Sequence, residues 1–319
     1  MKVLITGATG LVGKKIVALC HAHDVDVNYL STSEDKIVSE DNYQGFYWNP
    51  DDNKIDFGCF EGVTAIINLA GASISKRWTA KYKEEILSSR LNSLKTLYYA
   101  LEKIDHSQIT SFISASAIGI YPHSLSNFYE EDEKDVDEGF LGNVTQLWEK
   151  EVDTFKTFDF NIAKIRIGLV LSTDGGALPE MAKPINNYVG AAFGSGNQWQ
   201  SWIHINDLAR IFLYVLENDL QGIFNGVAPN PVTNSKLTKE IANVLDKPLF
   251  LPNIPKFVMK ALLGEMSHIL FASQRVSSKK IEKEGFVFDY QNICRSLEHL
   301  YAHKQEEHTM GNEYSKEYT

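Results

Sequence analysis

The chain has 319 residues, of which 44% are hydrophobic and 23% charged, and its formal net charge at pH 7 is −10. This length and composition suffice for a full hydrophobic core in one large or two modest domains. The acidic balance argues against nucleic acid as a partner, because phosphates require a basic face. No apolar run approaches the ~18 residues of a membrane span, and the first residues read as a strand rather than a signal peptide, so we expect neither a membrane segment nor a leader.

The first half of the chain alternates strands with helices. Strands are predicted at 2–6, 25–32, 64–71, 111–117 and 161–172, and helices at 11–22, 79–103 and 140–157. An irregular stretch around 48–50 precedes the third of these strands. The strands lack a clean period-two alternation and are separated by helices, which indicates a parallel sheet covered on both faces. The predicted fold class is therefore α/β, a Rossmann-type doubly wound parallel sheet.

The second half is less regular and predicts a smaller mixed C-terminal domain. Residues 175–184 and 190–202 look like loops. A helix is predicted at 206–218 with Asn206 or Asp207 as its N-cap. A strand at 222–228 and helices at 235–246 and 255–264 follow. We expect a dinucleotide-binding domain over 1–228, with 170–200 contributing to the cleft, a substrate-side domain over 229–298 and a polar tail over 299–319.

Cysteine, histidine and acidic residues give few functional signals. The three cysteines are far apart and form no CxxC pair, which favours a reduced, cytoplasmic protein. The histidines form no HExxH motif and no His/Cys cluster, so no metal site is expected. The acidic run EEDEKDVDE at 130–138 is typical of a solvated loop.

A glycine-rich segment joins the first strand to the first helix. It reads TGATGLVGKK, with the spacing Gly7-x-x-Gly10-x-x-Gly13. The first glycine permits a tight turn, the second lets the backbone approach a pyrophosphate, and the third lets helix and strand pack closely. The free N–H groups at the helix N-terminus favour phosphate. A P-loop requires a different spacing. The segment therefore predicts dinucleotide binding.

The end of the second strand should contact the adenosine ribose. An acidic residue there selects NAD, and a basic residue accepts the 2′-phosphate of NADP. This chain carries Ser31, Thr32 and Ser33, whose hydroxyls can donate to a phosphate. Lys14 can add positive charge, and Lys36 either does the same or is simply solvated. The pattern favours NADP(H), with NAD(H) as the alternative.

Longer motifs resemble a known family. The glycine loop with NLAG at 68–71 and SASAIGIY at 114–121 resembles the extended and atypical short-chain dehydrogenase/reductases. Together with FLGNVTQLWE, RIGLVLSTDGGALPEM, GSGNQWQSWIHINDLA and GEMSHILFASQRV, these motifs are similar to an epimerase-like subgroup of YfcH-type proteins over residues 1–298. The resemblance implies a Rossmann domain, an NADP-type cofactor and a small C-terminal domain. Members are often labelled nucleoside-diphosphate-sugar epimerases without a settled reaction, and such a label is an analogy of fold.

The resemblance also implies which residues hold the cofactor. One departure is that many relatives have an Arg where this chain has Thr32 or Ser33. The implied contacts are Gly7, Thr9, Gly10, Leu11, Val12 and Gly13 for the pyrophosphate, Leu69, Ala70 and Gly71 for the adenosine half, Ser114, Ala115 and Ser116 for the nicotinamide ribose, and Gly168, Leu169 and Val170 for the nicotinamide.

The catalytic pair of the wider superfamily is missing. A Ser and a Tyr there polarise a carbonyl, and a Lys lowers the pKa of the Tyr. An alignment on Glu149 puts Leu141 and Thr145 at the Tyr and Lys positions, and the narrower family lacks the pair as well. Ser116 best matches the Ser, with Ser114 second, although both can equally be strand-end hydrogen-bonding residues.

Other side chains are candidates for a site. Arg90, on the helix after NLAG, can clamp an anion or form a surface ion pair. Trp199 and Trp202 suit a substrate wall, although core packing is favoured for Trp202. His204 and Tyr121 are candidate proton donors, and each can instead be structural.

Two functions remain open from the sequence. The first is an NADP(H)-dependent oxidoreductase or epimerase-type isomerase acting on an unidentified small molecule. The second is a non-catalytic NADP(H)-binding protein that reports redox state or engages a partner. The missing Tyr and Lys favour the second, and Ser116, Arg90 and the aromatic residues favour the first. The sequence leaves the oligomeric state open.

Overall fold

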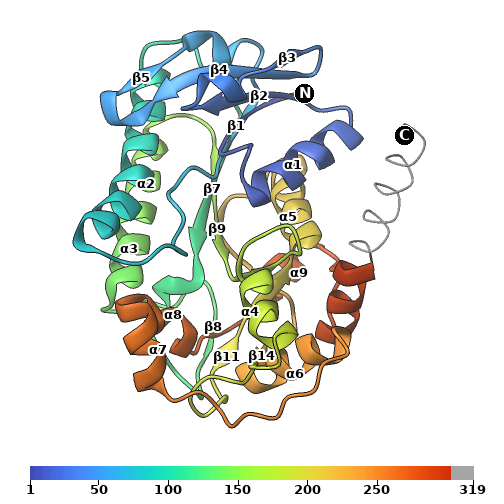
Figure 1. The fold of residues 1–319 in the computed structure, drawn as a ribbon. Helices are drawn as coiled ribbons and strands as arrows, with labels where there is room; N and C mark the ends of the chain where they lie inside the picture. The colour runs from blue at the N-terminus through green and yellow to red at the C-terminus, as the bar shows by residue number, and fades with distance from the viewer. Residues whose placement is uncertain (303–319) are drawn as a thin grey trace, which may run out of the picture.

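The computed structural model describes residues 1–302, and its centre is a nine-stranded sheet (Figure 1). The strand order is β13-β9-β7-β6-β1-β2-β4-β3, with β5 paired to β4. Every pair from β13 to β4 is parallel, and only β3 and β5 pair antiparallel with β4. The predicted α/β class is confirmed. The strands of the sheet are β1 (Lys2–Thr6), β2 (Asp26–Ser31), β3 (Ser39–Glu40), β4 (Tyr43–Asn49), β5 (Lys54–Ile55), β6 (Ala65–Asn68), β7 (Ser111–Ala117), β9 (Asn161–Ile167) and β13 (Gly222–Gly226).

Helices cover both faces of the sheet. In Figure 1, α2 and α3 lie on one side of it and α1 and α5 on the other, and each pair is in mutual contact. The central strands bury nearly every side chain because both faces are covered, which explains their continuous apolar sequences. These four helices are α1 (Leu11–Ala22), α2 (Ala80–Leu101), α3 (Phe140–Asp153) and α5 (Ile205–Glu217).

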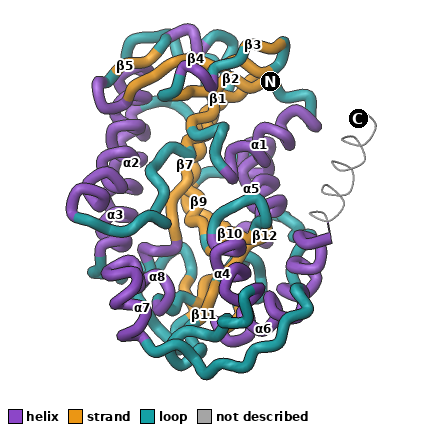
Figure 2. Tube along the Cα trace, in the orientation of Figure 1, coloured by secondary structure: helices purple, strands orange, loops and turns teal. Residues whose placement is uncertain are grey.

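The remaining elements gather at the carboxyl end of the sheet (Figure 2). They enclose a second hydrophobic cluster around Leu171, Leu178, Trp202 and Leu237. The region contains three short two-stranded ribbons, β10–β12, β11–β14 and β15–β8. Its elements are β8 (Phe128–Tyr129), β10 (Leu169–Leu171), α4 (Ala177–Asn186), β11 (Trp199–Gln200), β12 (Trp202–His204), β14 (Val232–Thr233), α6 (Asn234–Val244), α7 (Lys256–Leu263), α8 (His268–Phe271), β15 (Arg275–Val276) and α9 (Lys279–Lys283).

Three local predictions were wrong. The stretch around 48–50, predicted to be irregular, includes the end of strand β4, which adds to β2 because Gly45 leaves room for the ring of Tyr29. Residues 175–184, predicted to be a loop, include most of α4, with Pro184 in its last turn. The N-cap of α5 is His204, whose Nδ1 accepts from the backbone N–H of Asn206 at 3.1 Å.

The strand predicted over 161–172 is divided in two at Gly168. A Cβ at this position would lie 2.3 Å from the carbonyl oxygen of Ser201. The close approach lets the chain leave the main sheet after β9 and pair with β12 through β10. Of the polar tail predicted over 299–319, residues 303–319 lie outside the described part of the chain, whereas residues 299–302 are helical and Leu300 is buried in the second hydrophobic cluster.

Candidate functional site

The glycine loop forms a tight turn between β1 and α1. Gly7 has φ of +70°, a left-handed conformation that favours glycine. Gly10 is the N-cap of α1, and no side chain caps the helix. A Cβ on Gly13 would lie 2.2 Å from the carbonyl oxygen of Gly7. The first-turn N–H groups of α1 are therefore presented without a side-chain acceptor, as a phosphate site requires.

A buried hydrogen-bond network fixes the strand ends beside this loop. The hydroxyl of Thr6 donates to Asn68 Oδ1 at 2.8 Å and accepts from the backbone N–H groups of Leu69 and Ala70, each at 3.0 Å. The amide of Asn68 donates to the hydroxyl of Ser114 at 3.1 Å. The network spans the carboxyl ends of β1, β6 and β7, where the direction of the strand order reverses. Ligands of doubly wound sheets bind at this point.

The predicted ribose-binding residues lie where β2 ends. Ser31 and Ser33 bond locally, since Ser31 Oγ donates to the carbonyl oxygen of Ser33 and Ser33 Oγ donates to Asp35. This hydrogen bond lowers the pKa of the Asp35 carboxyl. Thr32 and Lys14 are exposed, and neither side chain bonds to another described residue. An acidic group four residues after Ser31 thus lies close to the predicted 2′-phosphate position.

A cleft of about 600 Å³ opens at the same edge of the sheet. One wall comes from α2, α3 and the 3₁₀ turn η4 (Ile118–Ile120), and the other from β11, α8 and the loop before β15. Gly168 and Leu169, predicted to approach the nicotinamide, line it. Leu141 and Thr145 line it as well, so the positions aligned with the superfamily Tyr and Lys face the cleft.

Arg90 lines the cleft from α2. Its Nη1 donates to the carbonyl oxygens of Ile86 at 2.7 Å and Ala72 at 3.2 Å, and its guanidinium lies 5.0 Å from the ring centroid of Trp148. Burial lowers the pKa of the guanidinium to about 10, so it is charged at neutral pH. Gly71 permits this placement, because a Cβ there would lie 3.0 Å from Cζ of Arg90. The predicted surface ion pair is not formed within residues 1–302.

The tryptophans divide between the cleft and the core. Trp199 lines the cleft and donates its indole N–H to the carbonyl oxygen of Leu125 at 3.0 Å. Trp202 is fully buried in the second hydrophobic cluster and does not line the cleft. Trp148 lines the cleft, and its buried indole N–H has no partner among the described residues.

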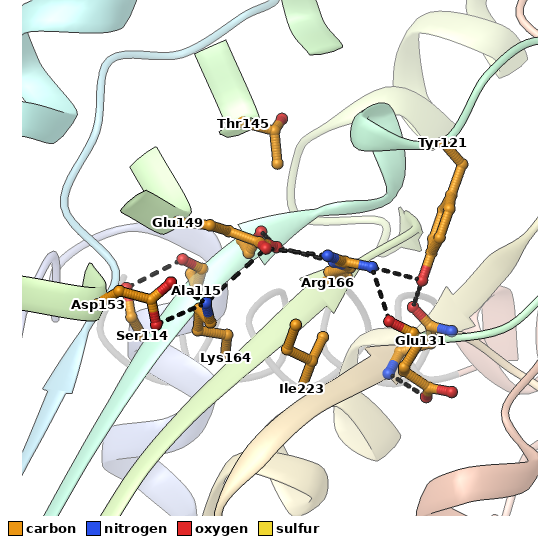
Figure 3. Close-up of polar contacts among 12 residues, drawn as sticks. Ser114, Ala115, Tyr121, Glu131, Thr145, Glu149, Asp153, Lys164, Arg166 and Ile223 are labelled. Carbon is orange, nitrogen blue, oxygen red and sulfur yellow. Dashed lines mark hydrogen bonds and ion pairs between the residues drawn. The ribbon is translucent and has the colours of Figure 1, made fainter. Parts of the chain in front are cut away.

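Two of the predicted catalytic residues, Ser116 and Tyr121, belong to a buried ionic network around Glu149 and Arg166, and Figure 3 shows Tyr121, Arg166 and Glu149. Ser116 donates to Glu149 Oε1 at 2.6 Å, and Arg166 binds both oxygens of Glu149 at 2.8 and 2.9 Å. Arg166 also donates to the hydroxyl of Tyr121 at 2.9 Å. Burial raises the pKa of Tyr121 to about 12, although Arg166 opposes the rise. Lys164 completes the network, 3.0 Å from Asp153.

The third predicted catalytic residue, His204, is also away from the cleft. It is fully buried, caps α5 and stacks on Tyr290 with ring centroids 3.6 Å apart. Ser116, Tyr121 and His204 therefore have structural contacts that the sequence did not reveal. Their catalytic role stays a prediction.

Several cleft residues were missed from the sequence. Lys83 on α2 contacts Glu265 in η6 (Gly264–Ser267), which joins the two walls. Asp137 and His268 also line the cleft. No motif marks them, because segments far apart in the chain meet only in the folded structure.

In residues 1–302, no group of three or more His, Cys, Asp or Glu side chains is placed to hold a metal ion. The same part of the chain has no helix that is both long and apolar enough to cross a membrane.

Comparison with known proteins agrees with this architecture. The family model described as "NAD dependent epimerase/dehydratase family" matches residues 3–145, and a "Domain of unknown function (DUF1731)" matches residues 254–300. An epimerase family protein of Staphylococcus epidermidis is 36% identical over 298 residues, covering 93% of this chain and 98% of its own length.

Solved structures show the same fold. The human epimerase family protein SDR39U1, solved with NADPH, superposes with a TM-score of 0.82 at 26% identity, covering 94% of this chain and 99% of that one. The nucleoside-diphosphate sugar epimerase of Corynebacterium glutamicum gives a TM-score of 0.74 at 28% identity, covering 96% of this chain and 61% of that one. From the full-length similarity to the staphylococcal relative and the matching fold, this chain belongs to the epimerase family proteins of the NAD-dependent epimerase/dehydratase family.

Proposed function

We propose that this protein is an NADP(H)-dependent oxidoreductase that acts on a small molecule in the cleft. The observation that carries the proposal is that the glycine loop and the cleft lie at the same carboxyl edge of the sheet, where the network from Thr6 to Ser114 fixes the strand ends. The human relative whose structure contains NADPH supports the choice of cofactor.

The residues present fit a dinucleotide. Gly10 has no side chain where the pyrophosphate belongs, and the first turn of α1 contains no acidic residue that would repel it. Gly168 and Leu169 border the cleft where the nicotinamide is expected. When bound, the nicotinamide supplies hydride transfer, and the protein orients it and excludes water.

The reaction proceeds without the superfamily's proton donor. Leu141 has no ionisable proton to donate. The hydroxyl of Thr145 donates to the carbonyl oxygen of Leu141 at 2.8 Å. A positioned general acid typically contributes ~10²–10⁴-fold in rate. Carbonyl substrates that stabilise the negative charge developing on their own oxygen are therefore favoured. Epimerisation is disfavoured if it requires residue 141 to remove the proton from a substrate hydroxyl.

The second candidate is a non-catalytic NADP(H)-binding protein. The observation that favours it is that Ser116 and Tyr121 bond inside the ionic network and His204 is buried at a helix start. None of the three lines the cleft. Such a protein binds NADPH without consuming it.

Calorimetry with NADPH and NADH tests the shared part of both proposals. Wild-type protein is expected to bind NADPH, and Gly10→Val is expected to lose this binding while it stays folded. Unchanged affinity in Gly10→Val would refute the cofactor site. NADPH oxidation against a panel of carbonyl compounds then separates the two candidates, since only the oxidoreductase turns over.

A further inference from the structure

We propose that the cleft binds a monocarboxylate with an apolar or aromatic body, and that Arg90 holds its carboxylate. The inference rests on the proposed function, because it names the substrate class of the same cleft. Three features of the lining carry it: an unpaired cation, a small excess of positive charge to which this cation contributes, and a mostly apolar surface.

Arg90 has hydrogen-bonding capacity to spare. Its two intramolecular bonds both use Nη1, so Nε and Nη2 have no partner among the described residues. These two groups form the planar edge that binds a carboxylate through two parallel hydrogen bonds. No carboxylate of the described chain pairs with it. A partly buried cation without a counter-charge is costly, and an anionic ligand relieves this cost.

A second donor lies on the same wall. The indole N–H of Trp148, a residue that is only 6% exposed, lacks a hydrogen-bond partner, although buried polar groups are normally satisfied. Its ring lies beneath the Arg90 guanidinium. Since this N–H is itself buried, it is the ring of Trp148 that lines the cleft beneath Arg90.

The charge of the lining fits one negative group. The lining contains three cationic residues (Lys83, Arg90 and Lys256) and two acidic ones (Asp137 and Glu265). One positive charge is therefore in excess when the histidines are neutral. Lys83 is already paired with Glu265. A pyrophosphate carries at least two negative charges, which exceeds the single positive charge in excess in this lining. The cleft thus matches a monoanion better than a sugar nucleotide.

The rest of the lining fits an apolar body. Trp78 and Phe140 meet edge to face with centroids 5.1 Å apart, and Leu141 and Val144 continue this surface along α3. Phe271 contributes from the opposite wall. Pockets of this kind hold apolar ligands and use a few polar groups for orientation. A polyhydroxylated sugar would leave many hydroxyls without partners here.

The anion on Arg90 has two possible sources, the substrate and the cofactor. Gly71, which contacts Arg90, is itself a predicted cofactor residue. The test therefore measures both ligands on the same samples. The probes are phenylacetate and 3-phenylpropionate, each compared with its neutral amide of equal shape, by ligand-observed NMR and calorimetry in the presence of saturating NADPH.

Wild-type protein is expected to bind at least one acid about 10- to 100-fold more tightly than its amide, the range of a charge-assisted hydrogen bond. Arg90→Gln should abolish this preference and Arg90→Lys should retain part of it. Lys95→Gln, an exposed charge on the same helix, is the matched control and should change nothing. Near-ultraviolet circular dichroism checks that the variants are folded.

Equal binding of acids and amides to the wild-type protein, or binding of neither, would overturn the proposal without any variant. Loss of NADPH affinity in Arg90→Gln, with the acid preference intact, would assign the anion to the cofactor and overturn it too. NADPH binding with no acid binding refutes only this inference. Absence of NADPH binding in the wild-type protein refutes the proposed function instead.

Discussion

Replacing Glu149 by Gln tests the ionic network beneath the cleft. The carboxylate accepts one hydrogen bond from Ser116 and two from Arg166, and Lys164 lies 3.9 Å away. Glutamine has nearly the same shape but no charge, and its amide NH₂ would face a guanidinium donor. Arg166, which is 5% exposed, would keep at most the amide oxygen of the new glutamine, the hydroxyl of Tyr121 and a long contact to the carbonyl oxygen of Glu131 at 3.4 Å, none of which carries a negative charge.

The expected cost is that of leaving a buried charge uncompensated, about 3–5 kcal/mol in the free energy of unfolding. Asp153→Asn is the matched control. It removes a partner of Lys164, but its carboxylate is 38% exposed and screened by water, so we expect a loss of about 1 kcal/mol. The double variant Glu149→Leu with Arg166→Met removes both charges and should recover most of the loss.

Urea unfolding followed by circular dichroism measures all four proteins under one set of conditions. A loss below about 1 kcal/mol in Glu149→Gln would show that the network is not the stabilising unit we infer. A double variant that is no more stable than Glu149→Gln would show that removing the second charge does not relieve the cost of the first.

Gly13→Ala should prevent correct folding or lower the melting temperature strongly, because its Cβ would overlap backbone atoms, and a variant as stable as the wild type would contradict the close packing. Lys14→Ala should reduce the NADPH:NADH affinity ratio about 10- to 100-fold, and an unchanged ratio in calorimetry would remove Lys14 from the 2′-phosphate site. Asp35→Asn should raise NADPH affinity relative to NADH, most clearly at low salt, whereas a lowered ratio would show that the carboxylate does not repel the phosphate. Tyr121→Phe should cost about 1–3 kcal/mol in stability, because two buried partners lose the phenol, and should leave NADPH oxidation unchanged. Lost turnover at unchanged stability would instead support the proton-donor role of Tyr121.

The regular part of the fold could be predicted from the sequence because its signals are local. β1 and β6 are short apolar runs bounded by polar residues, and the glycine spacing marks the turn after β1. β4 escaped prediction because its aromatic residues and Gly45 form no apolar run. Its pairing depends on how Tyr29 packs against Gly45.

The site was predictable only in part, because side-chain direction depends on tertiary partners. The alignment on Glu149 placed Leu141 and Thr145, and both line the cleft. Ser116, in contrast, donates to Glu149, which lies 33 residues later in the chain on α3. A sequence pattern shows that a serine lies at the end of a strand, but it does not show which group accepts the hydrogen bond from its hydroxyl.

The ribbons at the carboxyl end of the sheet determine how this protein can be altered. β8 follows β7 but pairs with β15, and β11 lies between β9 and β13 but pairs with β14. The part of the cleft wall that these ribbons form is therefore built from segments that leave the main sheet at several points of the chain. A chain cut after residue 228 would leave β8 and β11 without their partner strands. Such a wall cannot be transplanted between homologues as one continuous cassette, so redesign of its ligand preference has to proceed by substitutions made in place.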